Sequence, residues 1–153
     1  MRFCIFMAGC ISLIFYGIVS PSREFRLENY FTGEFAFHTT DNIQSSLITR
    51  TTNLGFAFIH HTHSYDAVYL RPRFSRIDGE SITIREQLDA QDILTTLNAR
   101  RISTSRIGEI YIVHAHTNRI PVFITHDGRR SNIQIAIRDS STTIGWPAIL
   151  GSF

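Results

Sequence analysis

The sequence predicts a mostly β domain, an antiparallel β-sandwich of the jelly-roll type with about nine short strands and one helix. Three observations support this fold class. Apolar and polar residues alternate with the two-residue period of a strand in several segments, including residues 109–116 and 132–138. Turn signals such as Asp78-Gly79 and Asp127-Gly128 separate the segments at regular spacing. Helical periodicity is convincing only over residues 89–101.

The predicted sandwich is organised around residues 55–74, a stretch rich in apolar residues that also contains three histidines and two arginines. Residues 56–61 and Tyr65–Arg71 are expected to form two neighbouring strands, joined by a polar turn. Pro72 then ends the second strand or places it at a sheet edge, because proline lacks the N–H that a ladder requires.

The remaining elements are expected on both sides of this strand pair. The other strands are expected at residues 30–40, 47–51, 81–85, 109–116, 119–126 and 132–138. The last of these should point Ile133, Ile135 and Ile137 inward and the residues between them outward. Asp89 is expected to cap the single helix, whose apolar stripe consists of Ile93, Leu94 and Leu97.

Composition describes a globular chain with no electrostatic preference for nucleic acid. Of the 153 residues, 43% are hydrophobic and 18% are charged, which excludes a disordered chain. The formal net charge of +2 is too small for a nucleic-acid binder, which usually presents a basic patch. All 15 basic residues are arginine. Two alternative explanations are open: codon bias or drift, and selection against amine chemistry such as ubiquitin attachment. Arginine also makes bidentate contacts that lysine cannot.

Residues 1–22 are expected to be a signal peptide or a signal anchor. Arg2 precedes an uncharged, largely apolar run that extends to about Val19, and Ser20 and Ser22 offer small residues for cleavage. Both cysteines lie within this segment, so a mature chain would contain no thiol. The sequence therefore predicts an exported single domain at residues 23–153, associated with a membrane only if the N-terminal segment stays uncleaved.

Three segments together resemble the concanavalin A-like jelly roll, the sandwich of laminin-G domains and laminarinase-type glucanases. They are residues 31–37, residues 55–58 with 65–72, and residues 120–128. The resemblance implies binding of a sugar or a glycoconjugate. It does not extend to hydrolysis, because the glucanases carry alternating acids on one strand, whereas the six glutamates of this chain are scattered over different segments.

A weaker resemblance is to the catalytic subunits of ADP-ribosyltransferase toxins. Residues 101–105 are similar to the Ser-Thr-Ser strand of that family, and residues 109–115 to the strand that follows. Leu70 stands where the family places its NAD-contacting arginine, and the chain lacks the family's Glu-x-Glu or Gln-x-Glu acid pair. A relative of this kind would be inactive.

The residues expected to bind a ligand are gathered near the end of the second predicted strand. Arg71 and Arg73 flank Pro72 and could clamp a carboxylate, a sulfate or a sialic acid in a bidentate manner. They could equally form a solvated rim with Asp66, Asp78 or Glu80. The full set of expected ligand-binding residues comprises His61, His63, Tyr69, Arg71, Arg73 and Trp146. Tyr69, His61 and Trp146 offer flat faces for a sugar ring, although each could instead belong to the core.

No metal site, cofactor or catalytic residue is expected. His114 and His116 have the spacing of a zinc pair, but a third ligand would have to come from elsewhere, such as His126 or His38. The predicted hairpin places His126 opposite Glu109 and away from His114. No nucleophile elbow, phosphate loop or Cys-His dyad occurs. The first hypothesis is therefore a secreted, lectin-like domain that binds a glycan or a glycosylated protein without catalysis. The alternatives are a degenerate toxin-type enzyme subunit and a structural protein-interaction domain.

Overall fold

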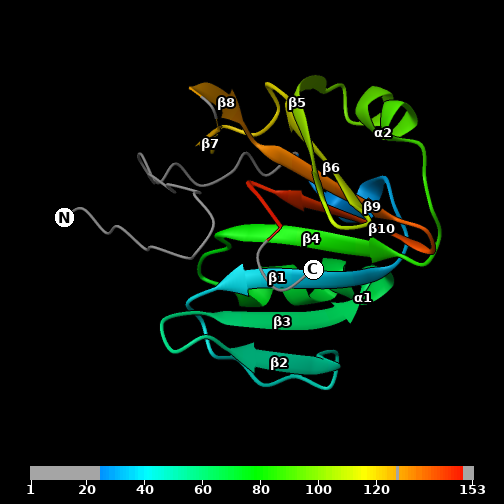
Figure 1. Cartoon of the computed structure of the whole chain (residues 1–153). Coiled ribbons are helices and arrows are strands. Elements are labelled where there is room, and N and C mark those ends of the chain that lie inside the picture. Colours follow the sequence, from blue (N-terminus) through cyan, green and yellow to red (C-terminus); the bar gives the residue numbers. More distant parts are fainter. Residues whose placement is uncertain (1–24, 127, 150–153) are drawn as a thin grey trace.

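One antiparallel sheet of eight strands dominates the computed structural model, which describes residues 25–126 and 128–149 (Figure 1). The strands of this sheet lie in the order β2-β3-β1-β4-β10-β9-β6-β5, and β7 and β8 pair separately. Their bounds are β1 Glu34–Thr39, β2 Arg50–Asn53, β3 Phe58–His63, β4 Gly79–Ile84, β5 Arg100–Ile107, β6 Ile110–His116, β7 Ile124–His126, β8 Arg129–Ser131, β9 Ile133–Arg138 and β10 Ser141–Trp146. The predicted mostly β class is confirmed. The predicted two-layer sandwich is not, because eight of the ten described strands belong to one sheet.

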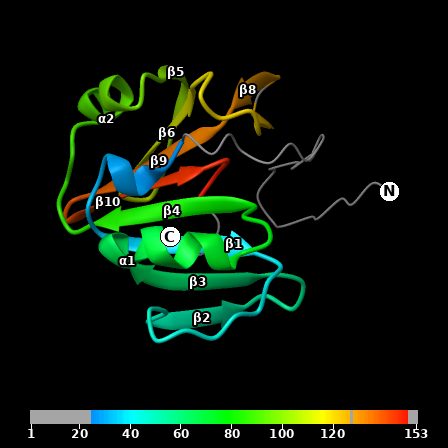
Figure 2. The same ribbon diagram turned by 180° about the vertical axis from the view of Figure 1, so that it is seen from behind.

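Helical segments cover one face of the sheet. They are η1 Leu27–Asn29, α1 Ser64–Leu70, η2 Arg71–Arg73 and α2 Ala90–Thr96. Figure 2 shows α1 and η1 in front of the sheet, with α2 near its β5 end. None of the helices in the described part of the chain is long and apolar enough to cross a membrane.

The hydrophobic core lies between this helical layer and the sheet. Strand alternation places Phe35 and Phe37 of β1 on the covered face, where they pack against each other with ring centroids 4.8 Å apart. Ile133, Ile135 and Ile137 of β9 join the same core, so their predicted inward orientation is confirmed. The apolar stripe of α2, Ile93, Leu94 and Leu97, closes the core at the other end.

The opposite face of the sheet is partly covered by the chain that follows β10. Ile149 N donates a hydrogen bond to Oε1 of Gln134 at 2.9 Å, which folds residues 147–149 back over the sheet after a cis Trp146-Pro147 bond. Two glycines make room for this approach. A Cβ at Gly79 would lie 2.7 Å from the carbonyl oxygen of Trp146, and one at Gly145 would lie 3.0 Å from Ile149.

The strand predicted at Tyr65–Arg71 is wrong, because α1 and η2 occupy these residues. Ser64, Ala67 and Leu70 are buried while Tyr65, Val68 and Tyr69 are exposed, which is the three- to four-residue period of a helix. A short run of mixed aromatic and aliphatic residues fits either period, and burial against the sheet decides for the helix. Pro72 fits this arrangement, since it stands at the start of η2 and not in a ladder.

Other predicted elements need smaller corrections. The helix predicted at 89–101 is confirmed but ends at Thr96. Arg100–Ile107 forms β5, a strand that was expected, over residues 101–105, only from the weaker toxin resemblance. The strand predicted at 119–126 is reduced to Ile124–His126. The tail contains an additional central strand, β10. The predicted leader, residues 1–22, and Asp127 of the predicted Asp-Gly turn lie outside the described residues.

Candidate functional site

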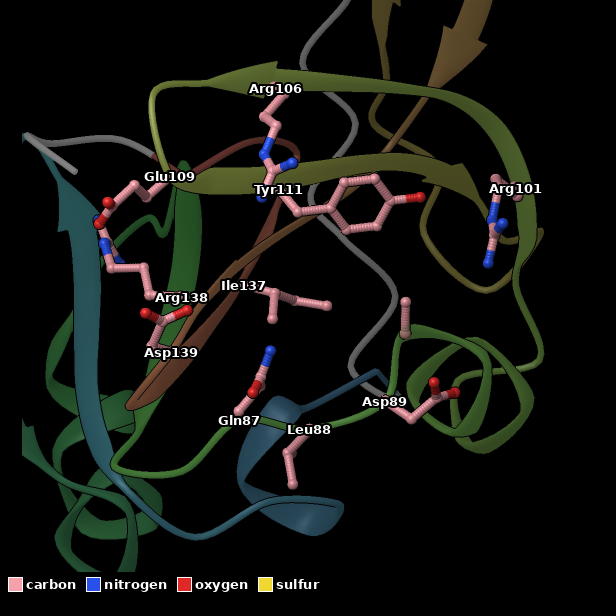
Figure 3. A pocket seen from close by; sticks show the side chains of 11 residues that line it. Gln87, Leu88, Asp89, Arg101, Arg106, Glu109, Tyr111, Ile137, Arg138 and Asp139 are labelled. Atoms are coloured by element: carbon pink, nitrogen blue, oxygen red, sulfur yellow. The ribbon is translucent and has the colours of Figure 1, made fainter.

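An open pocket of about 390 Å³ lies on the helical side of the sheet, between the β5–β6 hairpin, the end of β9 and the segment that leads into α2 (Figure 3). Its volume falls within the range of small-molecule sites, roughly 300–1,000 Å³. The lining residues are Gln87, Leu88, Asp89, Ala90, Arg101, Arg106, Glu109, Tyr111, Ile137, Arg138 and Asp139.

The floor of the pocket is an aromatic and aliphatic surface. Tyr111 of β6 stands directly opposite Ile137 of β9 in the ladder, so both side chains point to the same face of the sheet. Figure 3 shows Ile137 at the centre of the pocket, below the ring of Tyr111. Both residues belong to or pack against the core, and the hollow continues the core surface where the helices leave it uncovered.

Arginines from the edge strand form one wall. Arg106 is directly opposite Tyr111, and Arg101 is opposite Ala115 further along the same hairpin. Both arginines are exposed at the residue level, and their side chains reach the pocket. In Figure 3, Arg106 lies next to Tyr111, while Arg101 lies at the other end of the pocket, on the α2 side. Guanidinium groups in such positions can hold a carboxylate or sulfate with paired N–H donors.

The opposite wall is fixed in place by hydrogen bonds. Oγ1 of Thr142 accepts from Leu88 N at 2.9 Å and donates to the carbonyl of Glu86 at 3.0 Å, which ties this segment to β10. Oδ1 of Asp89 accepts from Gln91 N at 2.7 Å and from Asp92 N at 3.2 Å, and thereby caps α2 as predicted. These hydrogen bonds within the chain hold the wall in position without a ligand.

Two of the predicted binding residues, Arg71 and Trp146, lie close together, with Trp146 fully buried and Arg71 half-buried beside Glu28 and Glu80. Arg71 donates to both oxygens of Glu28, at 2.7 and 2.8 Å, and to Oε1 of Glu80. Its guanidinium carbon lies 5.2 Å from the ring centre of Phe37. Trp146 is fully buried, and its Nε1 donates to Oε2 of Glu80 at 3.2 Å. Burial raises the pKa of Glu80, against the opposing effect of Arg71.

The other four predicted residues are dispersed, with His63, Tyr69 and Arg73 exposed and His61 half-buried. His61 lies on the sheet face opposite α1, 3.2 Å from Glu34 and within hydrogen-bond distance of Arg50. Burial lowers the pKa of His61, and Arg50 adds to this effect, while Glu34 opposes it. His63 stacks on the exposed ring of Tyr65 with centroids 5.2 Å apart. Tyr69 is exposed on α1, and Arg73 donates to Ser45 at 3.1 Å.

The histidines of β6 and β7 are arranged differently from the prediction. The imidazole rings of His114 and His126 are stacked with their centroids 4.0 Å apart, although the predicted hairpin separated them. The reason is that β7 pairs with β8 and not with β6, so the short β7–β8 hairpin folds against the sheet near His114. Within residues 25–126 and 128–149, no group of three potential ligands could hold a metal ion.

The pocket residues were not recognised in the sequence because they are spread over residues 87–139. The available signal was the run from Arg100 to Ile107, which has β-branched and polar residues between its arginines. The backbone φ of Asn98 is +49°, as in many helix caps. A helix predicted to end at Asn98 would have left the following residues to be predicted as a strand.

Comparison with known protein families, with curated proteins and with solved structures finds no match for this chain.

Proposed function

We propose that this chain is an exported, non-catalytic carbohydrate-binding domain, and that its pocket takes an acidic sugar. The observation that carries this proposal is the direct cross-strand pairing of Arg106 with Tyr111 above Ile137. An aromatic ring and a planar cation thus stand next to each other on a fixed strand pair.

The floor suits the apolar side of a sugar. The carbon-bound hydrogens of a pyranose ring form an apolar face, and a Tyr ring accommodates such a face while its hydroxyl remains available for hydrogen bonding. Tyr111 and Ile137 offer such a surface at the bottom of the pocket.

The walls suit the polar groups of the same sugar. Arg101 and Arg106 can form charge-assisted hydrogen bonds to a carboxylate or a sulfate. Gln87 provides both an amide donor and an acceptor for hydroxyl groups. The acids Glu109 and Asp139 lie at the other end, beside Arg138, so a ligand with one charged end would be oriented.

The test is a titration of the purified protein with sialylated, uronic-acid-containing and neutral oligosaccharides. We expect binding of an acidic oligosaccharide that weakens with salt, and an affinity loss of about tenfold or more in Arg106→Gln and in Tyr111→Leu. Arg73→Gln, an exposed arginine outside the pocket, is the matched control and should bind like the parent.

Two results would reject the proposal. Equal affinity for neutral and acidic sugars would show that the arginines do not contribute to ligand recognition. Binding that survives Arg106→Gln but is lost in Arg73→Gln would place the ligand at η2 and not in the pocket.

The exposed side of α1 favours a second candidate, a protein-interaction domain. Tyr65 and Tyr69 are 67% and 69% exposed, and Val68 lies between them. Tyrosine is enriched at protein interfaces. Affinity capture of partner proteins with the parent and with Tyr65→Ser/Tyr69→Ser tests this candidate. A partner held equally by both forms would exclude the α1 surface.

A further inference from the structure

We infer that the outer edge of β5 binds an extended acidic peptide, which would add to the sheet as a ninth strand. This inference is independent of the proposed sugar site, although Arg101 and Arg106 contribute to both surfaces. It rests on the position of β5, the direction of its backbone groups and its charge.

Among the strands that the structure describes, none pairs with the outer side of the β5 backbone. In the strand order, β5 is the last strand and pairs with β6 alone. It spans eight residues, whereas β2 at the other edge spans four. Short edge strands are one way in which proteins avoid adding further strands, and a long edge strand is a template for main-chain pairing.

The β5–β6 turn determines which residues present their backbone groups outward. Gly108 and Glu109 form a two-residue turn, and Gly108 has a φ of +58°. Ile107 and Ile110 therefore form the hydrogen-bonded pair that closes the hairpin. Because bonding alternates along an antiparallel ladder, the N–H and C=O groups of Thr104 and Arg106 point away from β6.

A side-chain contact supports this assignment. Nη1 of Arg129 donates to the carbonyl of Ile102 at 3.5 Å, so the carbonyl of Ile102 also points away from β6. Ile102 lies two residues before Thr104, in the step where the ladder shifts register. The free pairing edge therefore begins after Ile102 and includes Thr104 and Arg106.

The charge of the edge favours an acidic partner over a second copy of this chain. Arg100, Arg101 and Arg106 all lie on β5, and no acid does. Two copies pairing antiparallel about the centre of β5 would place Arg101 of each directly opposite Arg106 of the other, and like charges in that position are destabilising. A peptide with acidic side chains at alternate positions would instead meet the arginines.

The alternation of β5 also defines the second face of the partner. Arg106 points to the helical side of the sheet, while Ser105 and Ile107 point to the other side. Ile107 is 59% exposed, so an apolar residue of the peptide would bury surface there. The expected partner alternates acidic and β-branched residues.

The experiment uses a fluorescein-labelled heptapeptide, Thr-Glu-Val-Glu-Val-Glu-Thr, and the purified full chain. Anisotropy should show binding, with at least tenfold weaker affinity for the same peptide with lysine in place of glutamate. Amide hydrogen exchange should then show about tenfold or greater slowing at Thr104 and Arg106, while the Ser105 amide, already bonded to β6, changes little.

A matched pair of variants isolates the main-chain contribution. Thr104→Pro removes one outward N–H but no β5–β6 hydrogen bond and no arginine, and proline is tolerated at sheet edges. It should abolish peptide binding, whereas Thr104→Val, which keeps the N–H, should not. Unchanged far-UV circular dichroism of both variants confirms that they are folded.

Three outcomes would overturn the inference: no binding at about 1 mM peptide, binding without protection of Thr104 and Arg106, or equal binding by Thr104→Pro and Thr104→Val. Thr104→Pro leaves Arg106, Tyr111 and Ile137 in place, so an acidic sugar should still bind this variant. In the parent chain, sugar binding without peptide binding would reject the strand-addition inference alone, and peptide binding without sugar binding would reject the proposed function alone.

Discussion

Trp146 and Glu80 are joined by a hydrogen bond in the interior, from the indole Nε1 to the carboxylate Oε2 over 3.2 Å. Both side chains are fully buried. Arg71 approaches the other oxygen of Glu80 and also holds Glu28, so one cation is shared between two carboxylates. The network connects η1, η2, β4 and β10, and its disruption should affect the whole domain.

Replacing Arg71 with methionine should destabilise the protein by about 3–5 kcal/mol, because it leaves two buried carboxylates without their cation. Urea unfolding measures the difference. Arg73→Met, at an exposed position two residues later, should change the unfolding free energy by less than about 0.5 kcal/mol. Equal effects of the two substitutions would show that the buried network contributes no stability.

Glu80 should make the protein less stable as pH rises. Its pKa is raised by burial, so the folded chain holds the proton more tightly than the unfolded chain. The stability due to the protonated form is complete below the ordinary pKa of 4.5 and is lost as pH rises through the raised pKa. Unfolding of the parent and of Glu80→Gln should be compared between about pH 4 and pH 8. A parent-minus-variant difference that does not fall with rising pH would contradict this assignment.

His38 should have the opposite effect and make the protein more stable as pH rises. It is 3% exposed, and burial, with a smaller contribution from His61, lowers its pKa from 6.5 to about 4. The unfolded chain then binds the proton more readily, so this stability is present above pH 6.5 and is lost as pH falls toward 4. The loss amounts to roughly 3 kcal/mol at 1.4 kcal/mol per pH unit. His38→Gln should lack this component, and a parallel pH profile for both proteins would refute it.

Asn132 should be among the polar residues most sensitive to truncation. Its side chain accepts from Thr117 N at 2.8 Å and donates to the carbonyls of Thr117 and Ile120 at 2.8 and 2.7 Å. Asn132→Ala leaves these buried backbone groups without partners and should cost about 2–4 kcal/mol in thermal or urea unfolding. Asn118→Ala, at an exposed position of the same connection, is the control and should have little effect.

Asp89 should contribute both to the helix and to the pocket wall. Asp89→Ala removes the cap of α2 and should cost about 1 kcal/mol, while Asp89→Asn keeps an acceptor oxygen and should cost much less. Thermal unfolding of the two variants measures this difference in stability. If the alanine variant is as stable as the asparagine variant, the cap has no measurable energetic role.

The parts of the fold that sequence predicts correctly are those whose periodicity is unambiguous. The isoleucines of β9 alternate without interruption, and Asp89 followed by a helical apolar stripe determines the start of α2. The strand prediction for residues 64–70 is wrong because their apolar positions fit both the two-residue period of a strand and the period of a helix. Only the buried positions, Ala67 and Leu70, reveal a helix, and burial depends on the sheet that the segment packs against.

The candidate site is harder to predict because register, and not local sequence, assembles it. Arg106 meets Tyr111 through a tight hairpin, but Ile137 reaches Tyr111 through the pairing of β6 with β9. Arg71 illustrates the converse. Its position beside Pro72 indicates an exposed strand end. In the fold, however, its guanidinium pairs with Glu28, more than forty residues earlier in the chain, and becomes half-buried.

The ion pair between Glu28 and Arg71 also limits how far the N-terminus can be trimmed. Phe25, Leu27 and Glu28 precede the first strand, and each is engaged with the core or with Arg71. A protease that cuts before Phe25 would leave Phe25, Leu27 and Glu28 on the chain. One that cuts after Glu28 would remove a carboxylate from Arg71 and open the core beside it, so a truncated chain should retain Phe25, Leu27 and Glu28 to stay stable.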